Sequence, residues 1–266
     1  MSRREPGVLQ FGMDATRSGV VETPFADKLR PLLAGLSTPT RIREVRAMLM
    51  GIDGFTEGAA RSLIDDLLAY RILLPKPQAT VAMLGSSPLA KSLRALLEDS
   101  GVAVRGPMGE ESEGAFLHRL PDDVPLVIVD RVARHIAVDR RLPTKRTWNI
   151  PVITVDARVV VGPVGHGETG PCLVCAEFYL LDRDPGMHQV ATDLPDGPPS
   201  TDPVVLSAGA AAATTLIRQA LEIPLPPGLS TSALQVGTTI AVDPFGPAPV
   251  QTEILGVHPR CPVCAV

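Results

Sequence analysis

The sequence predicts an α/β protein of two domains, and three observations support this. An apolar run at 80–85, TVAMLG, leads directly into an amphipathic helix and a second apolar strand, which is how a parallel sheet begins. The proline-containing stretch at 75–78 before it is typical of a linker. Ahead of that linker the chain alternates short apolar runs with helical periods. We therefore expect a small domain over residues 1–76 and an α/β domain over 77–266.

Composition limits the functions that the chain can serve. Of its 266 residues, 45% are hydrophobic and 20% charged, which is enough apolar material for a buried core. A formal net charge of −4 argues against a general nucleic-acid binder, and an aromatic fraction of 3% leaves little for stacking single-stranded bases. The start of the chain has no apolar signal region, and no apolar run reaches the roughly 20 residues of a membrane span. We expect a cytoplasmic protein in a reducing compartment.

The first 76 residues predict a winged-helix-like domain. Apolar runs at 7–13 and 19–24 flank a turn-rich stretch and predict a β-hairpin. Three helices should follow. The first spans 25–36, the second begins after an N-cap at Thr38 or Thr40, and the third begins after an N-cap at Thr56. A short strand closed by Pro75 should end the domain.

Such a domain has two common uses, DNA binding and peptide capture by strand addition to the hairpin edge. The charged residues of the expected third helix are Glu57, Asp65 and Asp66 against one Arg61, and this acidic balance matches phosphate poorly. The second helix carries Arg41, Arg43 and Arg46, so DNA binding stays open, although a solvated helix face explains these arginines as well. A dimerisation domain without a ligand is the third interpretation.

The second domain begins as a Rossmann-like unit with a degenerate phosphate loop. A dinucleotide fingerprint reads GxGxxG after the first strand, whereas 85–90 reads GSSPLA and keeps the first glycine alone. The second strand is followed by Arg105 where an acidic residue would hold a ribose. The pattern argues against ATP in the usual pose and favours Gly85 as a strand-to-helix turn. If a nucleotide binds, its site should include Gly85, Ser86, Ser87 and Asp130. The residues nearest to its phosphates should be Ser86, Ser87 and Lys91.

The rest of this domain should complete the sheet. The apolar run at 125–131 is a buried strand ending at Asp130, whose carboxylate either contacts a ligand or caps a helix. A basic helix-and-loop region at 132–148 and strands at 150–157 and 159–165 should follow. Asp202 or Ser207 should begin a helix whose alanine-rich part allows close packing, before strands near 233–242 and 250–257.

The four cysteines form two CxxC pairs, Cys172 with Cys175 and Cys261 with Cys264. Four thiolates are the ligand set of a closed tetrahedral zinc site. A redox CxxC, two disulfides and metal-free buried thiols are the alternatives. The presence of two pairs in a reducing compartment favours structural zinc, which would tie the chain end to the middle of the domain. The acidic stretch 177–184 after the first pair should be a solvated loop, and His166 and His258 flank the pairs without being needed as ligands.

Residues 80–266 resemble the ThiF/MoeB and ubiquitin-activating-enzyme family. The likeness rests on the Rossmann-like start, on GETGPCLVC at 167–175, on a helical crossover and on HPRCPVC at 258–264. Within it, the chain is most similar to the cyclodehydratase partner proteins of azoline-forming peptide biosynthesis. The resemblance implies an activating-enzyme-type domain behind a winged-helix peptide-recognition element. It also implies that the chain presents a precursor leader peptide to a YcaO-type, ATP-using enzyme.

Two departures from the family bear on mechanism. Adenylating members have an intact glycine-rich loop and an Asp-x-Asp stretch followed by Asn and Arg, and this chain has neither. Thioester-forming members need a cysteine beyond the zinc ligands, and here zinc would occupy all four. We expect a homodimeric recognition and docking protein with no catalytic residue of its own. The alternatives are an ATP-dependent adenylating enzyme and a winged-helix transcription regulator with a Rossmann-like sensor domain.

Overall fold

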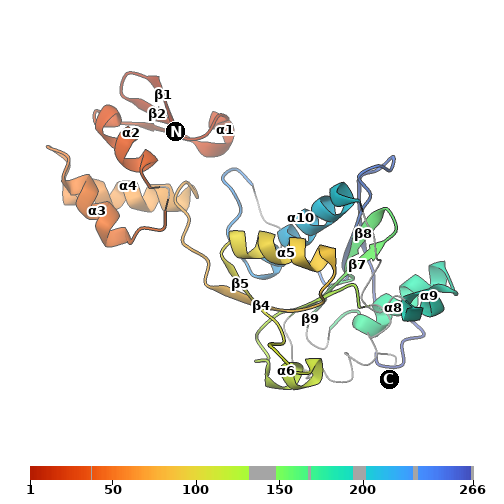
Figure 1. The fold of residues 1–266 in the computed structure, drawn as a ribbon. Coiled ribbons are helices and arrows are strands. Elements are labelled where there is room, and N and C mark those ends of the chain that lie inside the picture. The colour runs from red at the N-terminus through yellow and green to blue at the C-terminus, as the bar shows by residue number, and fades with distance from the viewer. Residues whose placement is uncertain (37, 132–147, 167–168, 194–201, 230–232, 265–266) are drawn as a thin grey trace. The chain divides into compact units, whose positions relative to one another are not determined.

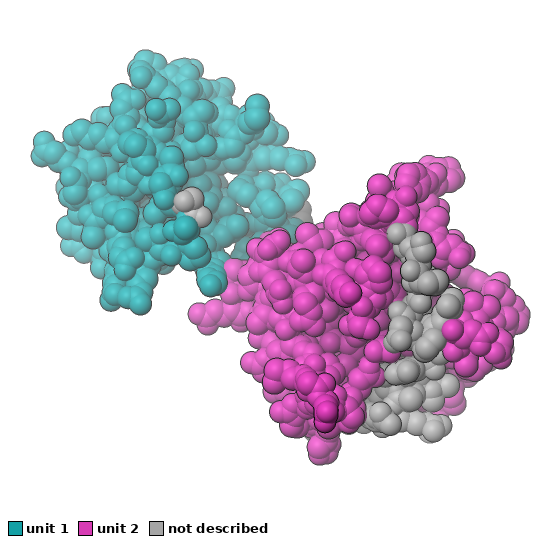
Figure 2. Space-filling view, viewed as in Figure 1, with its two compact units in different colours: residues 1–76, 223–232 teal, residues 77–222, 233–266 magenta. Residues whose placement is uncertain are grey.

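The computed structural model describes the chain except residues 37, 132–147, 167–168, 194–201, 230–232 and 265–266 (Figure 1). The chain folds into two compact units, one of residues 1–76 with 223–232 and one of 77–222 with 233–266 (Figure 2). The sequence did not reveal that the described residues 223–229 belong to the first unit. Most of the basic region predicted at 132–148 lies outside the described residues. No helix in the described part of the chain is long and apolar enough to cross a lipid bilayer.

The first unit contains a three-stranded antiparallel sheet in the order β1-β2-β3. Its strands are β1 (Ser2–Glu5), β2 (Val8–Gln10) and β3 (Val20–Glu22). The predicted hairpin is the antiparallel pair β2–β3, and the short helix α1 (Ala15–Ser18) forms in its connection. Strand β1 has the sequence SRRE and was not predicted, because charged residues give no apolar alternation.

Three further helices complete this unit: α2 (Ala26–Ala34), α3 (Ile42–Met50) and α4 (Glu57–Ala69). They and β2 enclose one core, made of Leu9, Ala26, Leu29, Val45, Leu49, Ile52, Ala60 and Ile64. The predicted cap of α4 is confirmed, since the Thr56 hydroxyl accepts a hydrogen bond from Ala59 N at 3.2 Å.

Two local predictions in the first unit are wrong. Arg41, not a threonine, holds the N-cap position of α3 and makes no side-chain capping bond. The Thr40 hydroxyl instead donates to Thr38 O. The short strand predicted directly before Pro75 does not form in the described residues 70–75. Instead Arg71 takes a left-handed backbone conformation (φ 57°), and the N–H groups of Ile72 and Leu73 both donate to Leu67 O. The chain thus turns back over the end of α4 and cannot extend.

The second unit is built on a mixed sheet in the order β11-β10-β8-β7-β6-β4-β5. The strands β5, β4, β6 and β7 are parallel, and β8, β10 and β11 continue the sheet antiparallel, while β9 pairs with β7. The strand bounds are β4 Ala79–Leu84, β5 Val102–Arg105, β6 Leu126–Val129, β7 Trp148–Val155, β8 Arg158–Val161, β9 Gly165–His166, β10 Thr238–Val242 and β11 Val250–Ile254.

Helices cover both faces of this sheet. On one face α5 (Pro88–Asp99) packs against α10 (Pro203–Ala220), which also contacts β8 (Figure 1). On the other face α6 (Glu113–Arg119) and the start of α8 (Leu173–Arg183) share a core with β4 and β6. Helix α9 (Met187–Asp193) follows α8. Asp202 caps α10 by accepting from Val204 N at 2.7 Å, which confirms the first of its two predicted starts.

Candidate functional site

The four cysteine thiols meet in one cluster in the second unit. Their sulfur atoms all lie within 4.8 Å of one another. Cys172 lies 3.8 Å from Cys175 and 3.6 Å from Cys261, and Cys175 lies 3.8 Å from Cys264. A tetrahedral site with Zn–S bonds of ~2.3 Å requires sulfur atoms about 3.8 Å apart. The cluster is therefore of the right size to hold a metal ion, and its sulfur atoms are too far apart for disulfides.

Local structure places each half of the cluster. Cys172 is the N-cap residue of α8, and Cys175 lies in its first turn, so the partial positive charge of the helix end favours the thiolate form. Cys261 lies in a turn that is closed by a hydrogen bond of 3.0 Å from the Cys261 backbone N–H to His258 O. Cys175 and Cys261 are fully buried, and a shell of Val174, Phe178 and Tyr179 packs around the thiols.

The thiols differ in acidity. Hydrogen bonds, first from the Cys172 thiol and then from His258 N–H, outweigh burial and lower the pKa of Cys175 to about 5. Burial raises the pKa of Cys264 to about 11. Because a bound metal replaces the thiol protons, loading the cluster must release the proton of Cys264 at neutral pH.

His258 joins the two halves of the cluster. Its ring is buried between Phe178, stacked at 5.2 Å, and Tyr179, edge-on at 4.9 Å. Its Nδ1 accepts from Arg260 N at 3.1 Å, so Nε2 carries the proton and donates to Asp182 at 2.8 Å. Asp182 also pairs with the Arg260 guanidinium. These contacts fix the C-terminal cysteine turn to α8.

The acidic stretch at 177–184 is not the solvated loop that was expected. It forms most of α8, and its acidic groups have partners. Glu177 is buried, and its Oε1 atom forms a hydrogen bond of 3.2 Å with His188 Nδ1. Burial raises the pKa of the Glu177 carboxyl group. The helical period of this stretch, with Phe178 and Tyr179 turned toward the cysteines, was the signal that could have predicted it.

The second candidate region is the end of the parallel strands, where the chain order reverses at β4. Ligands of open α/β sheets bind at such a point. A Cβ atom on Gly85 would lie 2.5 Å from Val129 O, so glycine here permits the close approach of β4 and β6. Beside it, Ser87 Oγ donates to Asp130 Oδ2 at 2.5 Å, and Asp130 Oδ1 accepts from Thr154 N at 2.7 Å.

This network gives Asp130 a third interpretation, as a buried connector of three elements. Asp130 has a left-handed backbone conformation (φ 53°) and little exposure, and its oxygens bind α5 through Ser87 and β7 through Thr154. Ser87 at the same time caps α5, accepting from Ala90 N at 3.2 Å. Ser86 and Lys91 lie exposed nearby in sequence, and their approach to a phosphate stays a prediction. Thr154 was not identified from the sequence, because no motif marks it.

The chain is similar to known proteins in its three-dimensional structure. No protein-family model and no curated protein matches the sequence. A solved heterocyclase in complex with substrate and cofactor superposes with a TM-score of 0.54 at 14% identity, over 92% of this chain and 36% of that one. The heterocyclase TruD gives 0.51 at 16% identity, over 92% and 39%. E. coli MccB with MccA gives 0.51 at 12% identity, over 97% of both chains.

The chain has the fold of these proteins. It spans little more than a third of the length of the two heterocyclases but nearly the full length of MccB. At identities of 12–16%, the similarity shows a shared architecture and does not show a shared activity. The likeness to MccB, which covers 97% of both chains, extends over the first unit as well as the large sheet.

Proposed function

We propose that this chain is a recognition and docking protein without catalysis of its own. The first unit binds a precursor leader peptide, and the second holds a structural zinc ion, forms a homodimer and docks a YcaO-type, ATP-using cyclodehydratase. The observation that carries the proposal is the likeness to MccB bound to MccA over 97% of both chains, together with the likeness to two heterocyclases.

The outer strand β3 is the edge that fits peptide capture. Among the described residues β3 pairs with β2 alone, and β1 is the opposite edge. Strand β1 carries Arg3 and Arg4 and its residues are all exposed, and charged edges oppose pairing with a further strand. Strand β3 instead offers Val20 and Val21, so an extended peptide adds there.

The register of β3 indicates which of its backbone groups are available to the proposed peptide. Gly19 O accepts from Phe11 N, and Thr23 N donates to Gly7 O, so residues 19, 21 and 23 point their backbone groups toward β2. By strand alternation, Val20 and Glu22 point theirs outward. Their N–H and C=O groups are the ones that an added strand would pair.

Zinc is the metal that suits the cysteine cluster. Four thiolates in a closed, largely buried cluster select soft metal ions over magnesium or calcium. Cys172, Cys175, Cys261 and Cys264 would hold the ion, which would act as a structural cross-link. With four sulfur ligands it has no open position for substrate.

A capture experiment tests the function. Immobilised full-length protein is incubated with an extract of its source cells, and bound peptides and proteins are identified by mass spectrometry. We expect a small peptide and an ATP-using enzyme. Val20→Pro removes one outward N–H and should lose the peptide while keeping the enzyme, whereas Val20→Thr keeps the N–H and should keep both. Recovery of neither ligand, or equal peptide recovery with both variants, would sink the proposal.

A further inference from the structure

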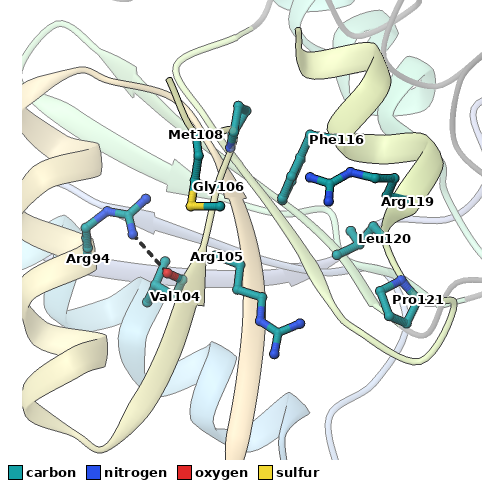
Figure 3. Close-up of a pocket in the computed structure, with 10 residues that line it drawn as sticks. Arg94, Val104, Arg105, Gly106, Met108, Phe116, Arg119, Leu120 and Pro121 are labelled. Atoms are coloured by element: carbon teal, nitrogen blue, oxygen red, sulfur yellow. Dashed lines mark hydrogen bonds between the residues drawn. The ribbon is translucent and has the colours of Figure 1, made fainter. Parts of the chain in front are cut away.

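A cavity of about 660 Å³ lies at the carboxyl end of the edge strand β5 in the second unit (Figure 3). One wall is the chain that leaves β5 at 104–108, and another is the end of α6 with the turn at 120–121. Its volume is typical of sites for small organic ligands, and the carboxyl ends of parallel strands are where such sites occur. The crevice at Gly85 is separate, since none of its residues lines this cavity.

Three arginines from three elements line the cavity. Arg94 comes from α5, Arg105 is the last residue of β5, and Arg119 is the last residue of α6. Figure 3 shows Arg94 at the left and Arg119 at the right, with the Arg105 side chain between them and lower in the view. Guanidinium groups arranged in this way offer planar pairs of donors, which match carboxylate and phosphate oxygens.

Two of these arginines are already held in place, and one is not. Arg94 donates to Val104 O at 3.1 Å and lies 3.7 Å from Glu98. The Arg119 guanidinium binds Glu111, with Nε 3.0 Å from Oε1. In the part of the chain that the structure describes, Arg105 has no recorded hydrogen bond or ion pair, and its side chain is exposed. Of the three arginines that line the cavity, Arg105 is thus the one without a carboxylate partner among the described residues.

The remaining lining supports a ligand with an apolar part. Gly106 leaves room for Arg94, because a Cβ atom there would lie 3.4 Å from Nη2 of Arg94 and 3.1 Å from Met83 O. Phe116 and Leu120 are buried and form the apolar wall, and Met108 is 76% exposed at the rim. In nucleotide-binding sheets an acidic residue after the second strand holds ribose hydroxyls. Arginine at this place selects anions instead.

We propose that this cavity binds a small molecule that carries at least two phosphate or carboxylate groups. Arg105 and Arg119 contact the anionic groups, and Arg94 completes the positive wall. The ligand is small because the cavity is bounded by a strand end and a short helix. This site is independent of peptide capture by the first unit.

The test is calorimetric titration of the full-length protein at fixed ionic strength with two probes, pyrophosphate and citrate. We expect at least one to bind with a dissociation constant below about 1 mM. Arg105→Gln and Arg119→Gln should each weaken binding at least about tenfold, because each removes a charged donor pair. Arg158→Gln, an exposed arginine at the start of β8, is the matched control and should leave binding unchanged.

Each outcome decides something. Binding of pyrophosphate alone assigns the site to phosphates, and binding of citrate alone assigns it to carboxylates. Absence of heat with both probes at 10 mM (about ten times the expected constant) overturns the proposal. It is also overturned if Arg158→Gln weakens binding as much as Arg105→Gln.

ATP is titrated in parallel. If ATP binds more tightly than either probe and responds to Ser87→Ala but not to Arg105→Gln, the crevice at Gly85 is the anion site instead.

Discussion

At the residue scale, Asp130 holds together the end of the parallel sheet. Its carboxylate accepts from Ser87 Oγ, Thr154 N and, at 3.3 Å, Thr154 Oγ1. A buried carboxylate needs such donors, because an unpaired one is costly. The sequence placed Asp130 at a strand end and left its role open. The structure identifies its partners, which are distant in sequence and carry no motif.

Ser87→Ala tests this network. The change removes the hydrogen bond to Asp130 and the cap of α5, so we expect it to lower the free energy of unfolding by about 1–3 kcal/mol. Ser86→Ala, at the exposed neighbouring position, should change it by less than about 0.5 kcal/mol. Urea denaturation of the full chain measures both. Equal effects of the two variants would show that the Ser87–Asp130 bond contributes nothing.

His258 is the second residue whose contacts lead to a prediction. Its ring fixes the C-terminal cysteine turn through Asp182, Phe178 and Tyr179. His258→Ala should therefore weaken zinc binding about tenfold or more, as loss of a supporting shell does at other metal sites. Competition with a chromophoric chelator measures this. His118→Ala, an exposed histidine on α6, should behave as wild type, and an identical affinity for His258→Ala would contradict the account.

At the element scale, helix α10 packs closely against β8 through Gly209. A Cβ atom there would lie 2.4–2.8 Å from three atoms of Val159. The alanine-rich sequence predicted close packing, and at Gly209 the space beside Val159 admits no Cβ atom. This close packing requires glycine at position 209, although glycine lowers intrinsic helix propensity.

Gly209→Ala should destabilise the protein. Overpacking costs about 1–3 kcal/mol, which exceeds the propensity gain of about 1 kcal/mol. Introducing the change into a Val159→Ala background should remove most of this cost, which denaturant melts of the four proteins would reveal. Gly58→Ala, in α4 with its nearest neighbouring atom at 4.0 Å, should stabilise by about 0.5–1 kcal/mol. A stabilising Gly209→Ala would contradict the packing.

Sequence patterns predicted elements best where one periodicity dominated. The helices α2 to α5 and α10 and the strands β4 and β6 follow clear apolar periods. Strand β1 and the turn after α4 were missed, because pairing with β2 and bonding to Leu67 O decide them, and neither contact leaves a local pattern. The cysteine cluster was predicted from spacing. Its supporting residues were not, since Asp182 and Glu177 read as ordinary surface charges.

At the scale of the whole molecule, the cysteine cluster closes the second unit by fixing the chain end to α8. Zinc present at about one thousand times its dissociation constant would add about 4 kcal/mol to stability. Removing it with a chelator should therefore lower the melting temperature of the second unit. Trp148 is the only tryptophan and lies in β7, so its fluorescence follows this unit. An unchanged Trp148 transition after proven loss of zinc would refute the structural role.

We have proposed that the first unit recognises a peptide by strand addition to β3. Backbone amide hydrogen exchange of the full-length protein, with and without the captured peptide, tests it most directly. The account predicts slower exchange at Val20 and Glu22, whose N–H groups point away from β2, and little change at Val21, which already pairs with Leu9. Protection confined to the second unit, or none in β3, would contradict the claim and leave the function of the first unit to be found elsewhere.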